Sequence, residues 1–165
     1  MHRPVLGRQN QMNSAPGTYA LILKSPQSMS VRVGKVGIFE FMPGYYIYTG
    51  SARGPGGLKA RVSRHLKMTK PCHWHIDYLT TRMPVVAIWY SYSNSSDECL
   101  WAAGLQSNRQ KYAEVSGLGA SDCSCLTHLF FCSKYPGLDD FTANLGAANH
   151  PESIDVWRIH SRQSD

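Results

Sequence analysis

The chain has 165 residues, 42% of them hydrophobic, which is enough for one domain with a packed core and excludes a wholly disordered chain. Seventeen Lys and Arg against eleven Asp and Glu give a net charge of +6, which would attract a polyanion such as nucleic acid. Five cysteines, no apolar stretch near the roughly 18 residues of a membrane span and no signal-peptide pattern lead us to expect a cytoplasmic protein without membrane association.

Composition divides the chain into one domain with short tails. Residues 1–16 are polar and show no periodicity, so we expect a flexible lead-in. A single domain is predicted over residues 17–160, and residues 161–165 should form a frayed tail. The sequence contains no internal repeat or low-complexity tract.

Three β-rich runs open the predicted domain. They are GTYALILKS at 17–25, VRVGKVGIFEF at 31–41 with glycine breaks, and YYIYTGSA at 45–52. The first run is expected to pair with the third across the intervening segment. The pattern therefore predicts a small, mostly antiparallel three-stranded sheet.

Tyrosines are concentrated on the first and third of these runs. Tyr46 and Tyr48 should share one face of the strand, with Tyr45 on the other. Tyrosines on strands are usually half-buried packing residues. The alternative for Tyr19 or Tyr48 is a hydroxyl that acts as a general base or positions a water molecule.

A glycine-rich loop at 53–57 leads into an amphipathic helix predicted at 58–68, with Leu58, Val62 and Leu66 as its apolar stripe. Helix N-termini favour anions, and this loop leads directly into the N-terminus of the predicted helix.

Arg61 and His65 lie four residues apart on this helix, so they should project from one face, roughly opposite the apolar stripe. One interpretation is a solvated basic face. The other is a phosphate clamp, because arginine offers a planar charged fork and histidine can exchange a proton near neutral pH.

The segment HWHIDYL at 73–79 fits either a short helix or an extended turn. His73 and His75 would be hydrogen-bonded in a packed turn with Asp77, or would border a cleft and contact a nucleic-acid strand. For Trp74, a core position is favoured over base stacking.

Further elements follow in the second half of the chain. VVAIWYSY at 85–92 predicts a strand, and residues 98–111 predict a helix capped by the preceding Ser or Asp residues. We expect a glycine-rich loop at 117–125, a short apolar element, HLFF, at 128–131 and an edge strand at 156–160. The order of elements predicts an α/β fold of the α+β type, a small sheet flanked by helices, with an extra C-terminal segment rich in Cys and His.

Cys99, Cys123, Cys125 and His128 form a candidate soft-donor cluster. Four N or S ligands would suit Zn²⁺ if the loop folds back onto the helix. Two alternatives stay open: a packed thiol cluster, or a reactive Cys123 with His128 as its base.

Residues 17–19, GTY, resemble the GIY half of the GIY-YIG nuclease signature, and residues 48–50, YTG, resemble its YIG half. Arg61 and His65 fall where that superfamily has an arginine and often a histidine, and Glu98 falls at its metal-binding glutamate. The longer string is similar to a small branch of the superfamily catalogued as a domain of unknown function (DUF 123). The insertion between the two halves is longer than is typical.

The resemblance implies a divalent-metal-dependent endonuclease acting on DNA, or less favourably on RNA. Glu98 would hold Mg²⁺ (or Mn²⁺), and Arg61 would stabilise charge in the transition state. Tyr19 would be the base or position the water, with Tyr48 assisting, and His65 would position or protonate.

An alternative is a non-catalytic nucleic-acid-binding or adaptor module that keeps the fold, with or without a stabilising Zn²⁺. In either case the expected nucleic-acid-binding residues are Lys59, Arg64, Lys67, His73 and His75.

Overall fold

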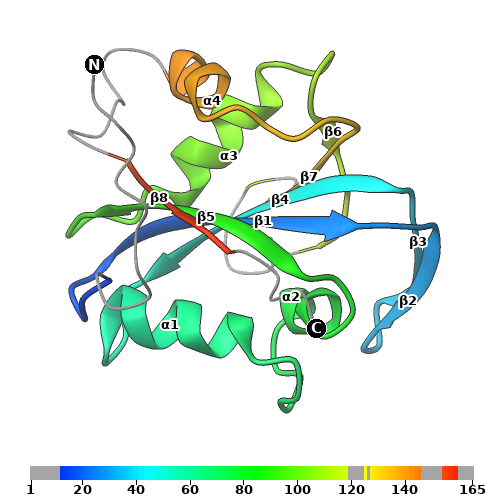
Figure 1. Cartoon of the computed structure of the whole chain (residues 1–165), viewed down its shortest axis with the longest axis horizontal. Coiled ribbons are helices and arrows are strands. Elements are labelled where there is room, and N and C mark those ends of the chain that lie inside the picture. Colours follow the sequence, from blue (N-terminus) through cyan, green and yellow to red (C-terminus); the bar gives the residue numbers. More distant parts are fainter. Residues whose placement is uncertain (1–11, 119–124, 126, 146–153, 160–165) are drawn as a thin grey trace, which may run out of the picture.

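The computed structural model describes residues 12–118, 125, 127–145 and 154–159, and it shows an α+β fold (Figure 1). One antiparallel sheet has the strand order β6-β7-β4-β1-β5-β8. Its strands are β1 (Gly17–Ser25), β4 (Gly44–Ala52), β5 (Val85–Tyr92), β6 (Ala113–Glu114), β7 (Leu129–Cys132) and β8 (Asp155–Arg158).

The expected pairing of the first and third runs is confirmed. β1 pairs antiparallel with β4, so that Tyr19 lies opposite Gly50 and Leu21 lies opposite Tyr48. β5 pairs with the other edge of β1. The centre of the sheet is therefore β4-β1-β5, and all residues of β1 except Lys24 are buried.

The prediction of a three-stranded sheet was wrong in two respects. β7 and β8 extend the sheet on either side, and β6 adds a two-residue strand beyond β7. The run at 31–41 is not part of this sheet. It contributes to a separate hairpin of β2 (Met29–Val33) and β3 (Gly37–Phe41), because the chain reverses at 34–36 and the two halves pair with each other.

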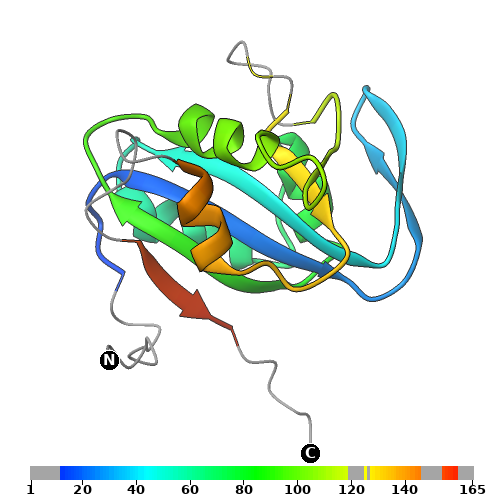
Figure 2. The ribbon, with the colours of Figure 1, turned by 90° about the horizontal axis from the view of Figure 1, so that it is seen from above.

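Helices cover both faces of the sheet. α1 (Gly57–Leu66) and α2 (His75–Thr80) lie on one face, and α3 (Glu98–Gln106) and α4 (Leu138–Leu145) lie on the other (Figures 1 and 2). Alternating side chains of the strands therefore enter two separate hydrophobic cores. The α1 side includes Leu21 and Leu58, whereas the α3 side includes Trp89 and Trp101.

The predicted helices match in position more closely than in length. α1 coincides with the helix expected at 58–68, and the ambiguous segment at 73–79 contains α2. α3 begins at the predicted residue but ends at Gln106, five residues earlier than expected. The short apolar element expected at 128–131 largely coincides with β7. β8 is an edge strand, as expected, and α4 was not predicted.

The residues just before β1 lie against the start of α1. The backbone N–H groups of Leu58 and Lys59 donate to the carbonyl oxygens of Ala15 (3.0 Å) and Asn13 (3.2 Å). Met12 is buried. No helix among the described residues is long and apolar enough to cross a membrane.

Candidate active cleft

A cleft of about 160 Å³ opens where β1 begins and β4 ends. All five residues expected to be catalytic line it, although they come from four different elements. The lining comprises Tyr19, Tyr48, Thr49, Gly50, Ser51, Arg61, His65, Trp74, Glu98 and His128.

The two strands that carry the GTY and YTG sequences, here called the motif strands, need glycine at two points of close approach. A Cβ on Gly50 would lie 2.5 Å from the ring carbon that bears the Tyr19 hydroxyl. A Cβ on Gly17 would lie 2.3 Å from the carbonyl oxygen of Ser91 and 2.5 Å from a methyl carbon of Leu58. Gly50 therefore gives the Tyr19 ring its place over β4, and Gly17 lets α1 approach β1 closely.

The cleft lies at an edge of the sheet, and this explains how both faces contribute to it. β7 pairs with β4 only at 45–48, and the Thr49 N–H then donates to the His128 carbonyl oxygen at 3.0 Å. The pleat of the remaining part of β4 turns Tyr48 toward α1 and Thr49 toward α3. Where the pairing of β4 with β7 ends, residues from the α1 side and from the α3 side of the sheet therefore line the same cleft.

Tyr19 and His65 form a buried pair on the α1 side. The Tyr19 hydroxyl lies 2.7 Å from Nε2 of His65, and each residue is only 1% exposed. Burial, reinforced by Tyr48, raises the pKa of Tyr19 well above its ordinary value. Burial, followed by the charge of Lys70, lowers the pKa of His65 to about 3. At neutral pH both side chains are therefore uncharged.

The expectation that His65 lies opposite the apolar stripe of α1 was wrong. His65 follows Leu58 by seven residues, almost two full helical turns, and therefore shares its buried side. Arg61 is half-buried at the rim of this side. Spacing by four correctly brings the two side chains together but does not say which face they share.

Trp74 holds the guanidinium groups beside the cleft. The guanidinium carbons of Arg61 and Arg64 lie 4.5 Å and 4.8 Å from the centre of its ring. Both distances are typical of cation–π contacts. Trp74 is 39% exposed, so the favoured core position was wrong, and its ring instead forms part of the cleft wall.

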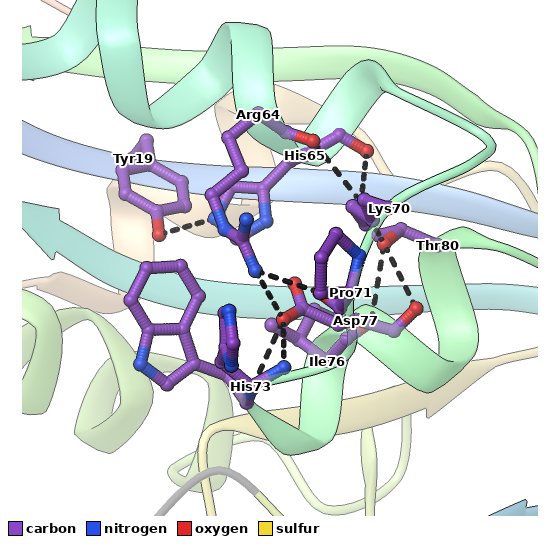
Figure 3. A network of polar contacts seen from close by, with 10 residues as sticks. Tyr19, Arg64, His65, Lys70, Pro71, His73, Ile76, Asp77 and Thr80 are labelled. Carbon is purple, nitrogen blue, oxygen red and sulfur yellow. Dashed lines mark hydrogen bonds and ion pairs between the residues drawn. The ribbon is translucent and has the colours of Figure 1, made fainter.

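Asp77 organises the segment before α2 (Figure 3). Its Oδ2 accepts hydrogen bonds from the backbone N–H groups of His73 (2.8 Å) and Trp74 (2.9 Å) and from Nη2 of Arg64 (2.8 Å). Burial raises the pKa of the Asp77 carboxyl, but these donors outweigh it and hold the pKa below its usual value. Asp77 thereby fixes Trp74 and engages Arg64, which leaves Arg61 as the cleft guanidinium.

Lys70 ties the end of α1 to α2. Its Nζ donates to the carbonyl oxygens of Arg64 (3.1 Å) and His65 (2.9 Å) and to the hydroxyl of Thr80 (2.7 Å) (Figure 3). A positive charge thus lies close to His65 and helps to keep the imidazole neutral.

Glu98 enters the cleft from the first turn of α3, as expected. Its carboxylate accepts a hydrogen bond from the hydroxyl of Ser51, which is on β4. The side chain is half-buried and lies in the first turn of the helix. A carboxylate oxygen held in this way is a suitable ligand for a hard cation.

Cys99, Cys125 and His128 meet beside Glu98, with their ligand atoms all within 4.8 Å of one another. Nε2 of His128 lies 3.9 Å from Sγ of Cys99, and Nδ1 lies 3.0 Å from the Thr49 hydroxyl. Burial lowers the pKa of His128 despite the nearby charge of Glu98. Three of the four expected cluster members therefore come together, and Cys123 is outside the described residues.

The residues expected to bind nucleic acid are more dispersed. Arg64 and Arg61 together line a neighbouring hollow of about 190 Å³. The other four lie outside both hollows: Lys59, Lys67 and His73 are exposed, and His75 is half-buried at the start of α2.

Two polar residues of the cleft were not among the predicted site residues. Thr49 and Ser51 lie in and directly after the YTG sequence, and each hydroxyl bonds a candidate ligand, His128 or Glu98. Their signal was the spacing of Thr49 and Ser51 by two residues, which puts both hydroxyls on one face of β4.

A protein-family model described as "Domain of unknown function DUF123" matches residues 18–149. The matched region contains β4, α1 and α3 and all residues that line the cleft. Neither the curated proteins nor the solved structures include a match to this chain.

Proposed function

The chain belongs to the family described as domain of unknown function DUF123, and we propose that it is a divalent-metal-dependent endonuclease that hydrolyses phosphodiester bonds in DNA. The observation that carries this proposal is the convergence of an arginine, a carboxylate and a buried tyrosine–histidine pair on one cleft. The resemblance of GTY and YTG to the GIY-YIG signature adds support, because these sequences lie side by side in the sheet.

Arg61 is the group that would bind the scissile phosphate. Arg64 is engaged by Asp77, whereas the guanidinium of Arg61 lines the cleft and is held against Trp74. A planar, permanently charged fork suits phosphate oxygens. Because the negative charge on these oxygens increases during attack, a fixed guanidinium stabilises the transition state more than the bound substrate.

Glu98 would hold the divalent ion. Its carboxylate, with the Ser51 hydroxyl beside it, offers the oxygen ligands that Mg²⁺ and Mn²⁺ accept, so these residues fit the ion. It is the one carboxylate among the described residues that line the cleft. Substrate phosphate oxygens and water would complete the coordination, so affinity without substrate should be weak. When bound, the ion would offset negative charge on the phosphate and on the leaving oxygen.

Tyr19 and His65 would handle the proton of the attacking water. The raised pKa of Tyr19 opposes a stored phenolate. The hydroxyl would instead accept a proton from the water while passing its own to Nε2 of the neutral His65. A bound phosphate would favour the resulting imidazolium, and Tyr48 would help to orient the water.

A second candidate function is nucleic-acid binding without cleavage. One observation favours it: the exposed Trp74 ring on two guanidiniums offers a base-stacking surface beside a site with a single carboxylate. This candidate predicts salt-sensitive binding that does not depend on Glu98.

The test is nicking of supercoiled DNA by the purified chain with Mg²⁺ or Mn²⁺, repeated on structured RNA. Glu98→Gln and Arg61→Ala should each lower the rate by about 10³-fold, the scale expected for loss of a charge that stabilises the transition state. Lys24→Ala is the matched control, because Lys24 is an exposed cation outside the cleft, near the other end of β1 from Tyr19. Full activity in both cleft variants would refute the assignment, and binding without cleavage under any metal would favour the second candidate.

A further inference from the structure

Beside Glu98, the cleft carries a second group of ligand atoms with a different chemistry. We propose that Cys99, Cys125 and His128 are ligands of one Zn²⁺ ion. The proposal does not depend on the nuclease assignment, because it rests on this cluster and on its link to β4 alone.

The chemistry of the donors selects the metal. Two thiolates and one imidazole are soft or borderline ligands, which suit Zn²⁺ and are poor ligands for Mg²⁺. Glu98 and Ser51 offer only oxygen. The thiol and imidazole group therefore suits Zn²⁺ and the oxygen group suits a hard cation, although α3 supplies one residue to each group.

The spacing of the three ligand atoms is close to what zinc requires. With Zn–S near 2.3 Å and Zn–N near 2.05 Å, a tetrahedral angle places a sulfur and a nitrogen ligand about 3.5 Å apart. Sγ of Cys99 and Nε2 of His128 are 3.9 Å apart, and all three atoms lie within 4.8 Å of one another. Small rotations of the side chains would close this gap.

The Thr49 hydroxyl gives His128 the orientation of a metal ligand. A zinc-bound histidine normally donates its other ring N–H to an oxygen, which fixes the ring and its tautomer. Nδ1 of His128 lies 3.0 Å from Oγ1 of Thr49, and Nε2 points toward Cys99. With Nδ1 as donor, the lone pair of Nε2 faces the thiols.

The site joins three separate parts of the chain. Cys99 is on α3, Cys125 and His128 precede β7, and Thr49 is on β4, where its N–H also donates to the His128 carbonyl oxygen. His128 lines the cleft as well. A bound zinc ion would therefore fix one cleft wall to the end of the second motif strand.

The experiment measures zinc in the full-length chain purified without added chelator. We expect about one zinc per chain, the stoichiometry of a single structural or catalytic site. Replacement by Co²⁺ should give thiolate-to-cobalt charge-transfer bands and the strong visible bands of tetrahedral coordination. The Co²⁺ spectrum tests the site in the wild-type chain, so the result does not depend on whether a variant folds.

Variants identify the ligands. Cys99→Ser, Cys125→Ser and His128→Asn should each abolish stoichiometric zinc, whereas Thr49→Val should weaken zinc binding by about 10- to 100-fold. Cys72→Ser is the matched control: Cys72 is also half-buried but lies outside the cluster. Glu98→Gln should retain zinc.

Three results would overturn the proposal. The first is a wild-type chain without zinc that also gives no thiolate bands with Co²⁺. The second is a loss of zinc in Glu98→Gln, which would place the ion on the carboxylate rather than on the thiols and the imidazole. The third is unchanged zinc affinity in both Cys125→Ser and His128→Asn.

Discussion

Two buried histidines line the same cleft, and their surroundings differ. His65 comes from α1 and bonds Tyr19 of the first motif strand, whereas His128 precedes β7 and bonds Thr49 of the second. They are 1% and 3% exposed, and burial lowers the pKa of each. By residue type, burial and hydrogen-bonded partner they are nearly equivalent.

The two histidines differ in the residues that surround them apart from the hydrogen-bonded hydroxyl. The positive charges of Lys70, Arg61 and Arg64 lie near His65, and the negative charge of Asp77 offsets them in part. Nδ1 of His65 has no hydrogen-bond partner among the described residues. His128 faces Cys99 and the Glu98 carboxylate. Cationic surroundings keep the imidazole of His65 neutral beside a site suited to phosphate, and thiol surroundings suit a metal ligand. The comparison teaches that the role of a buried imidazole depends on these neighbours.

Among changes to the surroundings of His65, the largest expected effect comes from removing the hydroxyl that it bonds. Tyr19→Phe should lower DNA cleavage by about 10²-fold or more, because the proton would lose its path to His65. Tyr46→Phe is the control, since Tyr46 is also a buried tyrosine but bonds the Met42 carbonyl oxygen away from the cleft. Equal rates for Tyr19→Phe and the wild type, measured in single-turnover reactions, would remove His65 from the mechanism.

Gly50→Ala should lower the free energy of unfolding by about 1–3 kcal/mol, because the added methyl group would enter the space of the Tyr19 ring. Urea denaturation measures this change. Gly54→Ala should have almost no effect, because nothing lies within 4 Å of the added Cβ. If both variants were equally stable, the close packing of the motif strands would be disproved.

Stability should depend on pH through His65. Its pKa is about 3 in the folded chain and 6.5 without burial, so the unfolded chain binds an extra proton between these values. Stability is therefore complete above about pH 6.5 and falls as the pH drops toward 3, by at most about 1.4 kcal/mol per pH unit for one group. His65→Gln should flatten this slope in metal-free protein, and an unchanged slope would contradict a neutral buried His65.

The smallest expected effect concerns Trp74. Trp74→Leu should weaken DNA binding by about 2- to 5-fold, the scale of an exposed cation–π contact, because Arg61 loses its support. Tyr135→Leu, an exposed aromatic residue outside the cleft, provides the control. Fluorescence anisotropy at fixed salt measures both, and equal affinities would show that Trp74 does not position Arg61.

The sequence predicted the central strands and the residues that line the cleft better than it predicted the environment of each side chain. The β-rich runs and the GTY and YTG sequences were enough to predict that β1 pairs with β4, and this pairing places Tyr19 opposite Gly50. The six-stranded sheet was not predictable in this way, because β7 and β8 are only four residues long and reach the sheet from distant parts of the chain.

Side-chain environments were harder to predict. The position of Trp74 on two guanidiniums depends on Asp77, whose carboxylate bonds two backbone N–H groups that only the folded turn brings together. The burial of His65 was predictable from its seven-residue spacing from Leu58, but the spacing from Arg61 suggested the opposite face. Contact between Cys99 and His128 joins α3 to a segment 29 residues away, which no local pattern encodes.

The most direct test of a cleft divided between two metals is a Mg²⁺ titration of DNA cleavage by zinc-containing protein. Glu98→Gln should retain zinc and lose cleavage at every Mg²⁺ concentration, whereas Cys125→Ser should lose zinc and still cleave in response to Mg²⁺. Cleavage by Glu98→Gln at the wild-type rate, or full cleavage by the wild type with zinc alone, would contradict the account.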